Sequence, residues 1–184
     1  MGDATAKSLN FYKGGVFYIL GEFDDTISTD IIPELVQKIN EEKNKKQGMI
    51  EFQISSRGGN TWKLFDLLSL IEQAKRNGII VKTVVTSIAY SCGSMLAASG
   101  TKGHRFIGEH AEHLCHLGDW ESSKVMNEEQ TEREALKLKE HFKKIRNLYK
   151  KYANIKNLDG VINNDRYYIR GKDIVKNGLA DILI

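Results

Sequence analysis

IEFQISSRGGNTWKLFDLLSLIEQAKRNGIIVKTVVT, residues 50–86, contains two short β-branched and aromatic runs separated by one amphipathic segment. The runs Ile50–Ser55 and Ile79–Thr86 predict strands. The segment Trp62–Arg76 predicts a helix, because Asn60 or Thr61 can cap its start and Asn77-Gly78 can end it. A strand, a helix and a second strand in this order predict parallel pairing through a crossover.

The same alternation extends toward both ends of the chain. Val16–Leu20 predicts an earlier strand, and a helix is expected from Thr29 to Lys43, with Thr29 or Asp30 as its cap and Pro33 in its first turn. A short helix over Cys92–Ser99 ends at Gly100. Further short strands are expected at Arg105–Ile107 and Glu112–His116. The fold class is therefore α/β, and the length of 184 residues suits a single domain over residues 1–184.

A long helix is expected from about 127 to 152. Its apolar positions follow spacings of three, four, three, four and three: Ala135, Leu138, Phe142, Ile145, Tyr149 and Tyr152. So narrow a seam is typical of helix pairing, which suggests an oligomer contact. The alternative is a solvated helix that lies on its own domain.

Composition excludes several classes of protein. The net charge of +3 is too small to indicate nucleic-acid binding. Two cysteines, Cys92 and Cys115, make no disulfide framework and agree with a reducing compartment. The first ten residues lack the apolar core of a signal peptide, and the least polar stretch, Ile79–Ser99, does not suit a membrane span. We expect a cytoplasmic protein.

Ser91 is the candidate nucleophile. It follows the predicted strand and begins the short helix, so its hydroxyl would lie at a strand-to-helix turn. The backbone N–H of Cys92 would then point toward an oxyanion on the substrate. The alternative is that Ser91 is a helix cap and nothing more, which is the commoner case for such a segment alone. Ser94 competes for the role from the next turn, and the Cys92 thiol is a weaker competitor.

Gly58-Gly59 follows the strand Ile50–Ser55 at its carboxyl end. Ligands of parallel sheets bind at that end, so this turn should lie near Ser91. Glycine lets a backbone N–H approach a substrate closely, and Gly59 could supply a second oxyanion donor. A tight turn without function is the alternative.

His116 is the candidate base. His110, His113 and His116 recur every three residues, which invites a zinc site. On a strand, however, His110 and His116 would stand about 20 Å apart and His113 would face the other way. We therefore expect no metal. Asp165 is the candidate acid that orients the imidazole, with Asp159, Asp173 and Asp181 as alternatives.

These motifs, in this order, resemble the proteolytic subunit of the Clp protease, a self-compartmentalised serine peptidase, from about Phe17 to Leu183. The family's Ser-Pro-Gly-Gly turn corresponds to residues 56–59 and its Ala-Ser-Met-Gly motif to residues 90–93. Counted from Phe106, its catalytic histidine falls on His116. Its Asp-Arg-Tyr/Phe segment falls on 165–167, and its closing Tyr-Gly-Leu-Val-Asp on 177–181.

The resemblance implies a crotonase-like fold with repeated β-α-β units and a protruding handle helix at about 127–152. Seven-membered rings would stack in pairs around a chamber. Ser91, His116 and Asp165 would form the triad, and the N–H groups of Gly59 and Cys92 the oxyanion site. The substrate would be an unfolded protein or peptide. No cofactor is implied, since ATP would be used by a partner unfoldase.

The chain also departs from the family's pattern. Arg57 replaces the turn proline, Cys92 replaces methionine, and Leu117-Gly118 replaces Gln-Pro. The glycine-rich handle strand becomes the segment 119–123, and one extra residue separates Asp165 from Gly178. Such departures would suit a divergent member of the family, phage-encoded or otherwise specialised. They leave two alternative functions: a non-catalytic ring or scaffold subunit, and a crotonase-type acyl-CoA enzyme.

Overall fold

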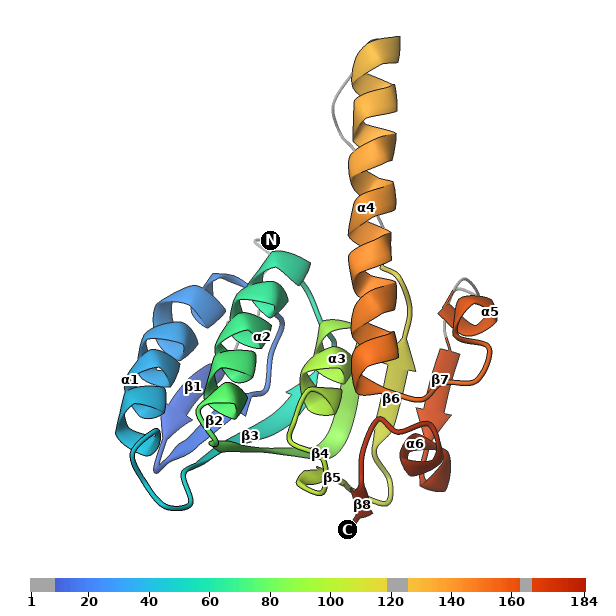
Figure 1. Ribbon diagram of the computed structural model, residues 1–184. Helices are drawn as coiled ribbons and strands as arrows, with labels where there is room; N and C mark the ends of the chain where they lie inside the picture. Colours follow the sequence, from blue (N-terminus) through green and yellow to red (C-terminus); the bar gives the residue numbers. More distant parts are fainter. Residues whose placement is uncertain (1–8, 119–125, 163–166) are drawn as a thin grey trace, which may run out of the picture.

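The computed structural model describes residues 9–118, 126–162 and 167–184 (Figure 1). Eight strands and six α-helices are present in this part of the chain. The strands are β1 Asn10–Lys13, β2 Val16–Ile19, β3 Met49–Ser56, β4 Ile80–Tyr90, β5 Arg105–Ile107, β6 Glu112–Cys115, β7 Tyr167–Arg170 and β8 Ile182–Leu183. The helices are α1 Ile32–Glu42, α2 Thr61–Arg76, α3 Cys92–Ala98, α4 Glu128–Tyr152, α5 Leu158–Ile162 and α6 Lys172–Lys176.

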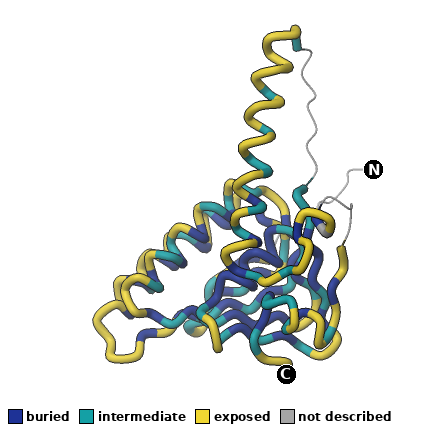
Figure 2. Tube along the Cα trace, turned by 45° about the vertical axis from the view of Figure 1, so that its right-hand side comes forward, coloured by how far each residue is buried: buried dark blue, intermediate teal, exposed yellow. Residues whose placement is uncertain are grey.

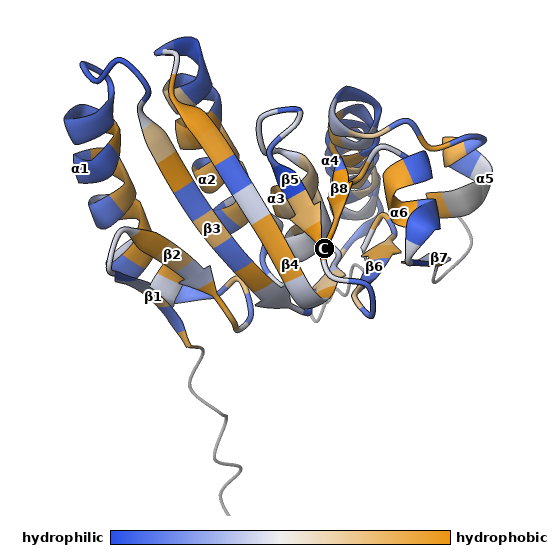
Figure 3. Cartoon of the chain, turned by 90° about the horizontal axis from the view of Figure 1, so that it is seen from below, coloured by the Kyte–Doolittle hydropathy of each residue, from blue (hydrophilic) through white to orange (hydrophobic). Residues whose placement is uncertain are grey.

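The strands form one mixed sheet in the order β1-β2-β3-β4-β5-β8. β2, β3 and β4 are parallel neighbours, as the β-α-β pattern predicts, while β1 adds an antiparallel edge that the sequence analysis missed. β3 alternates between buried and partly exposed residues, which is expected of a sheet with one covered face. Helices α1, α2 and α3 cover that face (Figures 1 and 3).

β4 is longer than predicted because it serves two partners in succession. Thr83–Val85 pair with β5, and Ile88–Tyr90 pair with β6. Thr86 and Ser87, which lie between these two regions, are exposed. β6 in turn pairs antiparallel with β7. The last residues of β4 therefore form a second, smaller group of strands with β6 and β7.

The helix boundaries follow local signals with one exception. The Asn60 side chain accepts a hydrogen bond from Trp62 N–H at 2.9 Å and so caps α2, as predicted. The predicted cap of α1 at Thr29 or Asp30 is wrong. A five-residue π-helical segment, Ile27–Ile31, precedes α1 and continues into it, so both residues lie inside helical structure.

α4 leaves the body of the protein. Its last turns are buried at Ile145, Tyr149 and Tyr152, but Ala135, at the other end of the apolar seam, is exposed. Figures 1 and 2 show the first half of the helix projecting beyond the sheet. The seam therefore packs on its own domain at one end only. Among the described helices, none has the length and apolar character needed to cross a bilayer.

The Arg105 guanidinium is buried where several helices end. It donates to the backbone carbonyls of Ala98, Tyr152 and Gly178, which lie at or just beyond the ends of α3, α4 and α6. It also forms an ion pair with Asp181. A cation at a helix C-terminus is favourable because the unpaired carbonyls there carry partial negative charge.

Candidate active site

Ser91 occupies a sharp turn between β4 and α3. Its φ is 53° and its ψ is −116°, a conformation that residues other than glycine rarely adopt. The Ser91 N–H donates to Leu114 O at 2.9 Å, which ties the turn to β6. The side chain makes no capping hydrogen bond to α3. A strained serine at a strand-to-helix turn is the geometry of a nucleophile elbow.

The competing serine is poorly placed. Ser94 is fully buried, and its Oγ lies 2.9 Å from Nδ1 of His113, which is also fully buried. A substrate carbonyl could not reach a hydroxyl in that position without unfolding the helix around it.

The Gly58-Gly59 turn packs directly against the Ser91 turn. Gly58 has a φ of 101° and Gly59 a φ of 135°, so both positions favour glycine. A Cβ atom at Gly58 would lie 2.9 Å from Tyr90 O, and one at Gly59 would lie 2.7 Å from Phe23 N. The prediction that this turn lies near Ser91 is confirmed.

Phe23 and Ser56 hold the glycine turn in place. Phe23 N–H donates to Gly58 O and Phe23 O accepts from Asn60 N–H, both at 2.8 Å. Ser56 Oγ accepts from Gly58 N–H at 3.1 Å and donates to Gly21 O at 2.6 Å. These bonds fix the backbone even though Arg57 occupies the family's proline position.

Cys92 links the glycine turn to α3. Its Sγ donates to Gly59 O at 3.2 Å. Burial raises the pKa of the thiol to about 12, so almost no thiolate exists at neutral pH. Cys92 is therefore a poor nucleophile, whereas its backbone N–H lies at the first turn of α3, beside Ser91.

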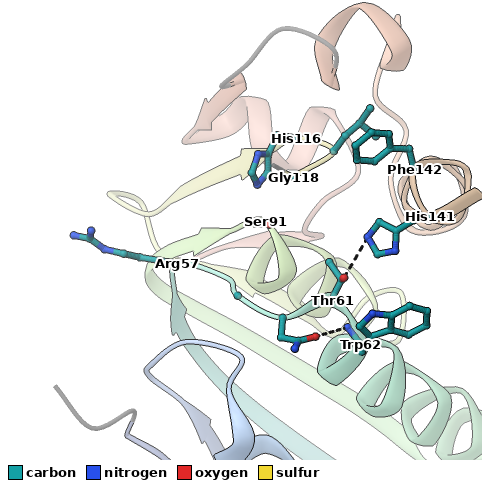
Figure 4. Close-up of a pocket in the computed structure, with 11 residues that line it drawn as sticks. Arg57, Thr61, Trp62, Ser91, His116, Gly118, His141 and Phe142 are labelled. Atoms are coloured by element: carbon teal, nitrogen blue, oxygen red, sulfur yellow. Dashed lines mark hydrogen bonds between the residues drawn. The ribbon is translucent and has the colours of Figure 1, made fainter. Parts of the chain in front are cut away.

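His116 follows β6 immediately. Because β6 pairs in parallel with the last residues of β4, the carboxyl ends of both strands meet at one edge. Ser91 and His116 emerge at that edge and line the same cavity of about 490 Å³ (Figure 4). Arg57 also lines the cavity, although the end of its side chain extends away from the other lining residues in the same view.

The far wall of the cavity comes from α2 and α4, and no pattern in the sequence predicted it. Thr61 Oγ1 lies 3.2 Å from Nε2 of His141, and Trp62 and Phe142 complete the wall. Burial, with some contribution from Lys144, lowers the pKa of His141. Phe142 was visible as part of the apolar seam, but nothing in the local sequence connects α4 with α2.

The orienting acid Asp165 lies outside the described residues. Each of its three alternatives pairs with a cation elsewhere: Asp159 with Arg146, Asp173 with Lys176 and Asp181 with Arg105. Asp181 is also remote, since Arg105 pairs with Thr83 near the start of β4. Eight residues separate Thr83 from Ser91, which at about 3.3 Å per residue corresponds to roughly 26 Å along the strand.

The three histidines do not form a metal site in this structure. His113 lies on β6 and is fully buried against Ser94, whereas His110 is exposed. Across residues 9–118, 126–162 and 167–184, no three potential ligands from His, Cys, Asp and Glu gather within reach of one ion.

A family model described as Clp protease matches residues 4–184. The chain belongs to the Clp protease family. ATP-dependent Clp protease proteolytic subunits from Leuconostoc citreum and Streptococcus mutans are each 31% identical to it over 104 residues. Subunit 2 from Bacillus licheniformis is 29% identical over the same length. These alignments cover 56% of this chain and 49%, 50% and 52% of the three relatives, so the chain spans about half of their length. The mixed α/β sheet agrees with the family's fold.

Proposed function

We propose that the protein is a serine endopeptidase that cleaves unfolded proteins or peptides. The observation that carries the proposal is the strained Ser91 turn, packed against Gly58 and sharing a cavity with His116. Family membership supports a peptidase, and the local geometry favours serine over the Cys92 thiol.

In the proposed reaction Ser91 Oγ attacks the peptide carbonyl while His116 accepts its proton. The N–H groups of Gly59 and Cys92 stabilise the oxyanion, as preorganised donors do in other acyl transfers. His116 then protonates the departing amine, and a water molecule, activated by the same imidazole, hydrolyses the acyl-enzyme. Asp165 would hold His116 in the tautomer that accepts the proton.

The proposal also includes an assembly. We treat residues 1–184 as one domain, since a single hydrophobic cluster contains residues from both strand groups. The projecting half of α4 would pack on other copies in a ring, stacked heptamers by family resemblance, and an ATP-dependent unfoldase would deliver substrate to the chamber in the cytoplasm. The relatives are described as ATP-dependent, which supports such a partner.

A fluorophosphonate probe tests the nucleophile directly. The purified, assembled protein should become labelled on Ser91, and Ser91→Ala should abolish both labelling and peptide cleavage. Ser99→Ala is the matched control, because Ser99 is a buried serine whose Oγ donates to Leu96 O at the other end of α3. This variant should retain both activities.

Two outcomes would overturn the proposal. An assembled sample with no label on Ser91 and no peptide cleavage would favour a non-catalytic ring subunit. Turnover of an acyl-CoA thioester that survives Ser91→Ala would favour a crotonase-type enzyme, which needs oxyanion donors but no serine nucleophile.

A further inference from the structure

Four buried polar side chains contact one another in the core, and the last of them contacts the backbone of His116. They are His113 and Cys115 on β6, Ser94 on α3 and Tyr149 on α4. His113, Ser94 and Cys115 are fully buried, and Tyr149 is 2% exposed. Buried polar groups are costly unless they are hydrogen-bonded, so four together on three different elements call for a physical explanation.

The four side chains form a continuous series of contacts. His113 Nδ1 lies 2.9 Å from Ser94 Oγ, and Ser94 Oγ lies 3.6 Å from Cys115 Sγ. The Cys115 thiol is hydrogen-bonded to the Tyr149 phenol. The series ends on the backbone of His116: Tyr149 Oη lies 3.4 Å from both its N and its O atom.

The unpaired ring nitrogen of His113 indicates which tautomer the ring adopts. His113 Nε2 has no hydrogen-bond partner among the described residues. A buried unpaired acceptor is tolerated better than a buried unpaired donor, so the proton belongs on Nδ1. Nδ1–H then donates to Ser94 Oγ. Between Ser94 Oγ and Cys115 Sγ either atom can be the donor. At the other end of the series the Tyr149 hydroxyl can donate to His116 O, which lies 3.4 Å away.

Burial keeps every member neutral near pH 7. It lowers the pKa of His113 to about 3, raises that of Cys115 to about 11 and raises that of Tyr149 well above 10. The series is therefore a fixed line of dipoles and does not itself titrate in the physiological range.

His116 is a position where such support would matter. On the β4 side the parallel pairing ends at Leu114, two residues before it. Tyr149 accepts from its N–H and donates to its O, as a neighbouring strand would.

We propose that Tyr149, supported by Cys115, Ser94 and His113, is a positioning residue that holds the His116 peptide so that the imidazole faces Ser91. This inference rests on the proposed peptidase function. It assigns a purpose to a buried serine–histidine pair that the reaction itself does not use.

Tyr149→Phe removes only the hydroxyl that contacts His116. We expect kcat for a small peptide to fall about tenfold with KM nearly unchanged, since a modest displacement of a catalytic group costs about that much or more. Tyr152→Phe is the matched control. Tyr152 lies on the same helix and is buried, but its hydroxyl donates to Glu72 at 2.8 Å. This control should lose stability without the tenfold loss in kcat.

Substitutions of Cys115 test whether this residue acts through its hydrogen bonds or only by filling space. If Cys115 acts through its hydrogen bonds, Cys115→Ser should retain more activity than Cys115→Ala. If it only fills space, alanine should be at least as active as serine, because serine places an extra polar group in the core. Activity of the alanine variant equal to or above that of the serine variant would overturn the proposal.

Hydrogen–deuterium exchange gives a readout that does not depend on catalysis. Tyr149→Phe should speed exchange in the peptide that contains His116, whereas Tyr152→Phe should not. Unchanged exchange in Tyr149→Phe would overturn the positioning role. Faster exchange in a protein that never labels on Ser91 would instead show that the backbone contact is real and that the proposed peptidase function is wrong.

Discussion

A methyl group at Gly58 would lie 2.7 Å from the Cβ atom of Ser91. The glycine turn and the nucleophile turn are therefore in direct contact, and neither can accept a larger residue without displacing the other. The candidate oxyanion site and the candidate nucleophile form one packed unit, although 32 positions separate Gly59 from Ser91 in the sequence.

Gly58→Ala should disable the site. The substitution combines a φ of 101° with the overlap on Ser91, and we expect fluorophosphonate labelling to slow by about 10²-fold. Gly103→Ala is the control, since Gly103 has a φ of 85° but no neighbour within 4 Å of the added Cβ. It should lose about 1 kcal/mol of stability and keep its labelling rate. Equal rates in both variants would refute the packing argument.

Asp165→Asn tests the remaining member of the triad. If Asp165 orients His116, kcat should fall by a factor on the order of 10²–10⁴ while assembly persists. Asp159→Asn offers a comparison, because Asp159 is an exposed carboxylate on α5 that pairs with Arg146 at 3.2 Å. It should change kcat little. A fully active Asp165→Asn variant would mean that another group orients the imidazole.

Alkylation distinguishes the hydroxyl from the neighbouring thiols. Burial raises the pKa of Cys92 to about 12 and that of Cys115 to about 11, so neither thiol should react readily with iodoacetamide at pH 7.5. Peptide cleavage should survive this treatment and be lost on fluorophosphonate treatment. Inactivation accompanied by a carbamidomethyl group on Cys92, detected by mass spectrometry, would indicate thiol chemistry instead.

Glu42 should make stability depend on acid pH. Glu42 is 5% exposed, and its carboxylate is bonded to Lys38 and Lys45, each at 2.8 Å. Chiefly the Lys38 bond lowers the pKa of this carboxylate from 4.5 to about 2. Because the folded-state pKa is the lower one, the stabilisation is present above about pH 4.5 and is lost as the pH falls toward 2.

Urea unfolding between pH 2 and 7 would measure this effect. Glu42→Gln should remove about 2–3 kcal/mol of stability at neutral pH and flatten the dependence below pH 4.5. Glu41→Gln alters the adjacent, exposed carboxylate and should leave the curve close to that of the natural protein. If the stability of Glu42→Gln followed a curve parallel to that of the natural protein from pH 2 to 7, Glu42 would not be the source of the pH dependence.

The sequence predicted correctly those helix and strand boundaries that depend only on neighbouring residues. Asn60 caps α2 and Gly78, with a φ of 75°, follows its end, as the sequence analysis expected. β4 was predicted too short because its last residues, after the polar Thr86 and Ser87, are held by pairing with β6, a distant segment. The cap of α1 was misplaced because the π-helical segment before it has no clear signature in sequence.

In the candidate site, too, some features follow from the sequence and others depend on contacts between distant segments. The order of motifs predicted that Ser91, Gly59 and His116 lie close together, and all three line one cavity. His141 and Trp62 escaped notice, because their roles depend on where α4 crosses the start of α2. Tyr149 was read as one apolar position of a helical seam, and only the packed structure places its hydroxyl at the His116 backbone.

The buried guanidinium of Arg105 couples the unfolding of three helices whose ends it contacts. α3 carries the Ser91 turn, α4 carries the cavity wall and Tyr149, and α6 belongs to the C-terminal region, yet the carbonyls at all three ends share one cation. Fraying of any one of these ends removes a partner from a charge that water cannot reach. The three helices should therefore unfold as one cooperative unit, and the nucleophile and its surroundings should be lost in a single transition.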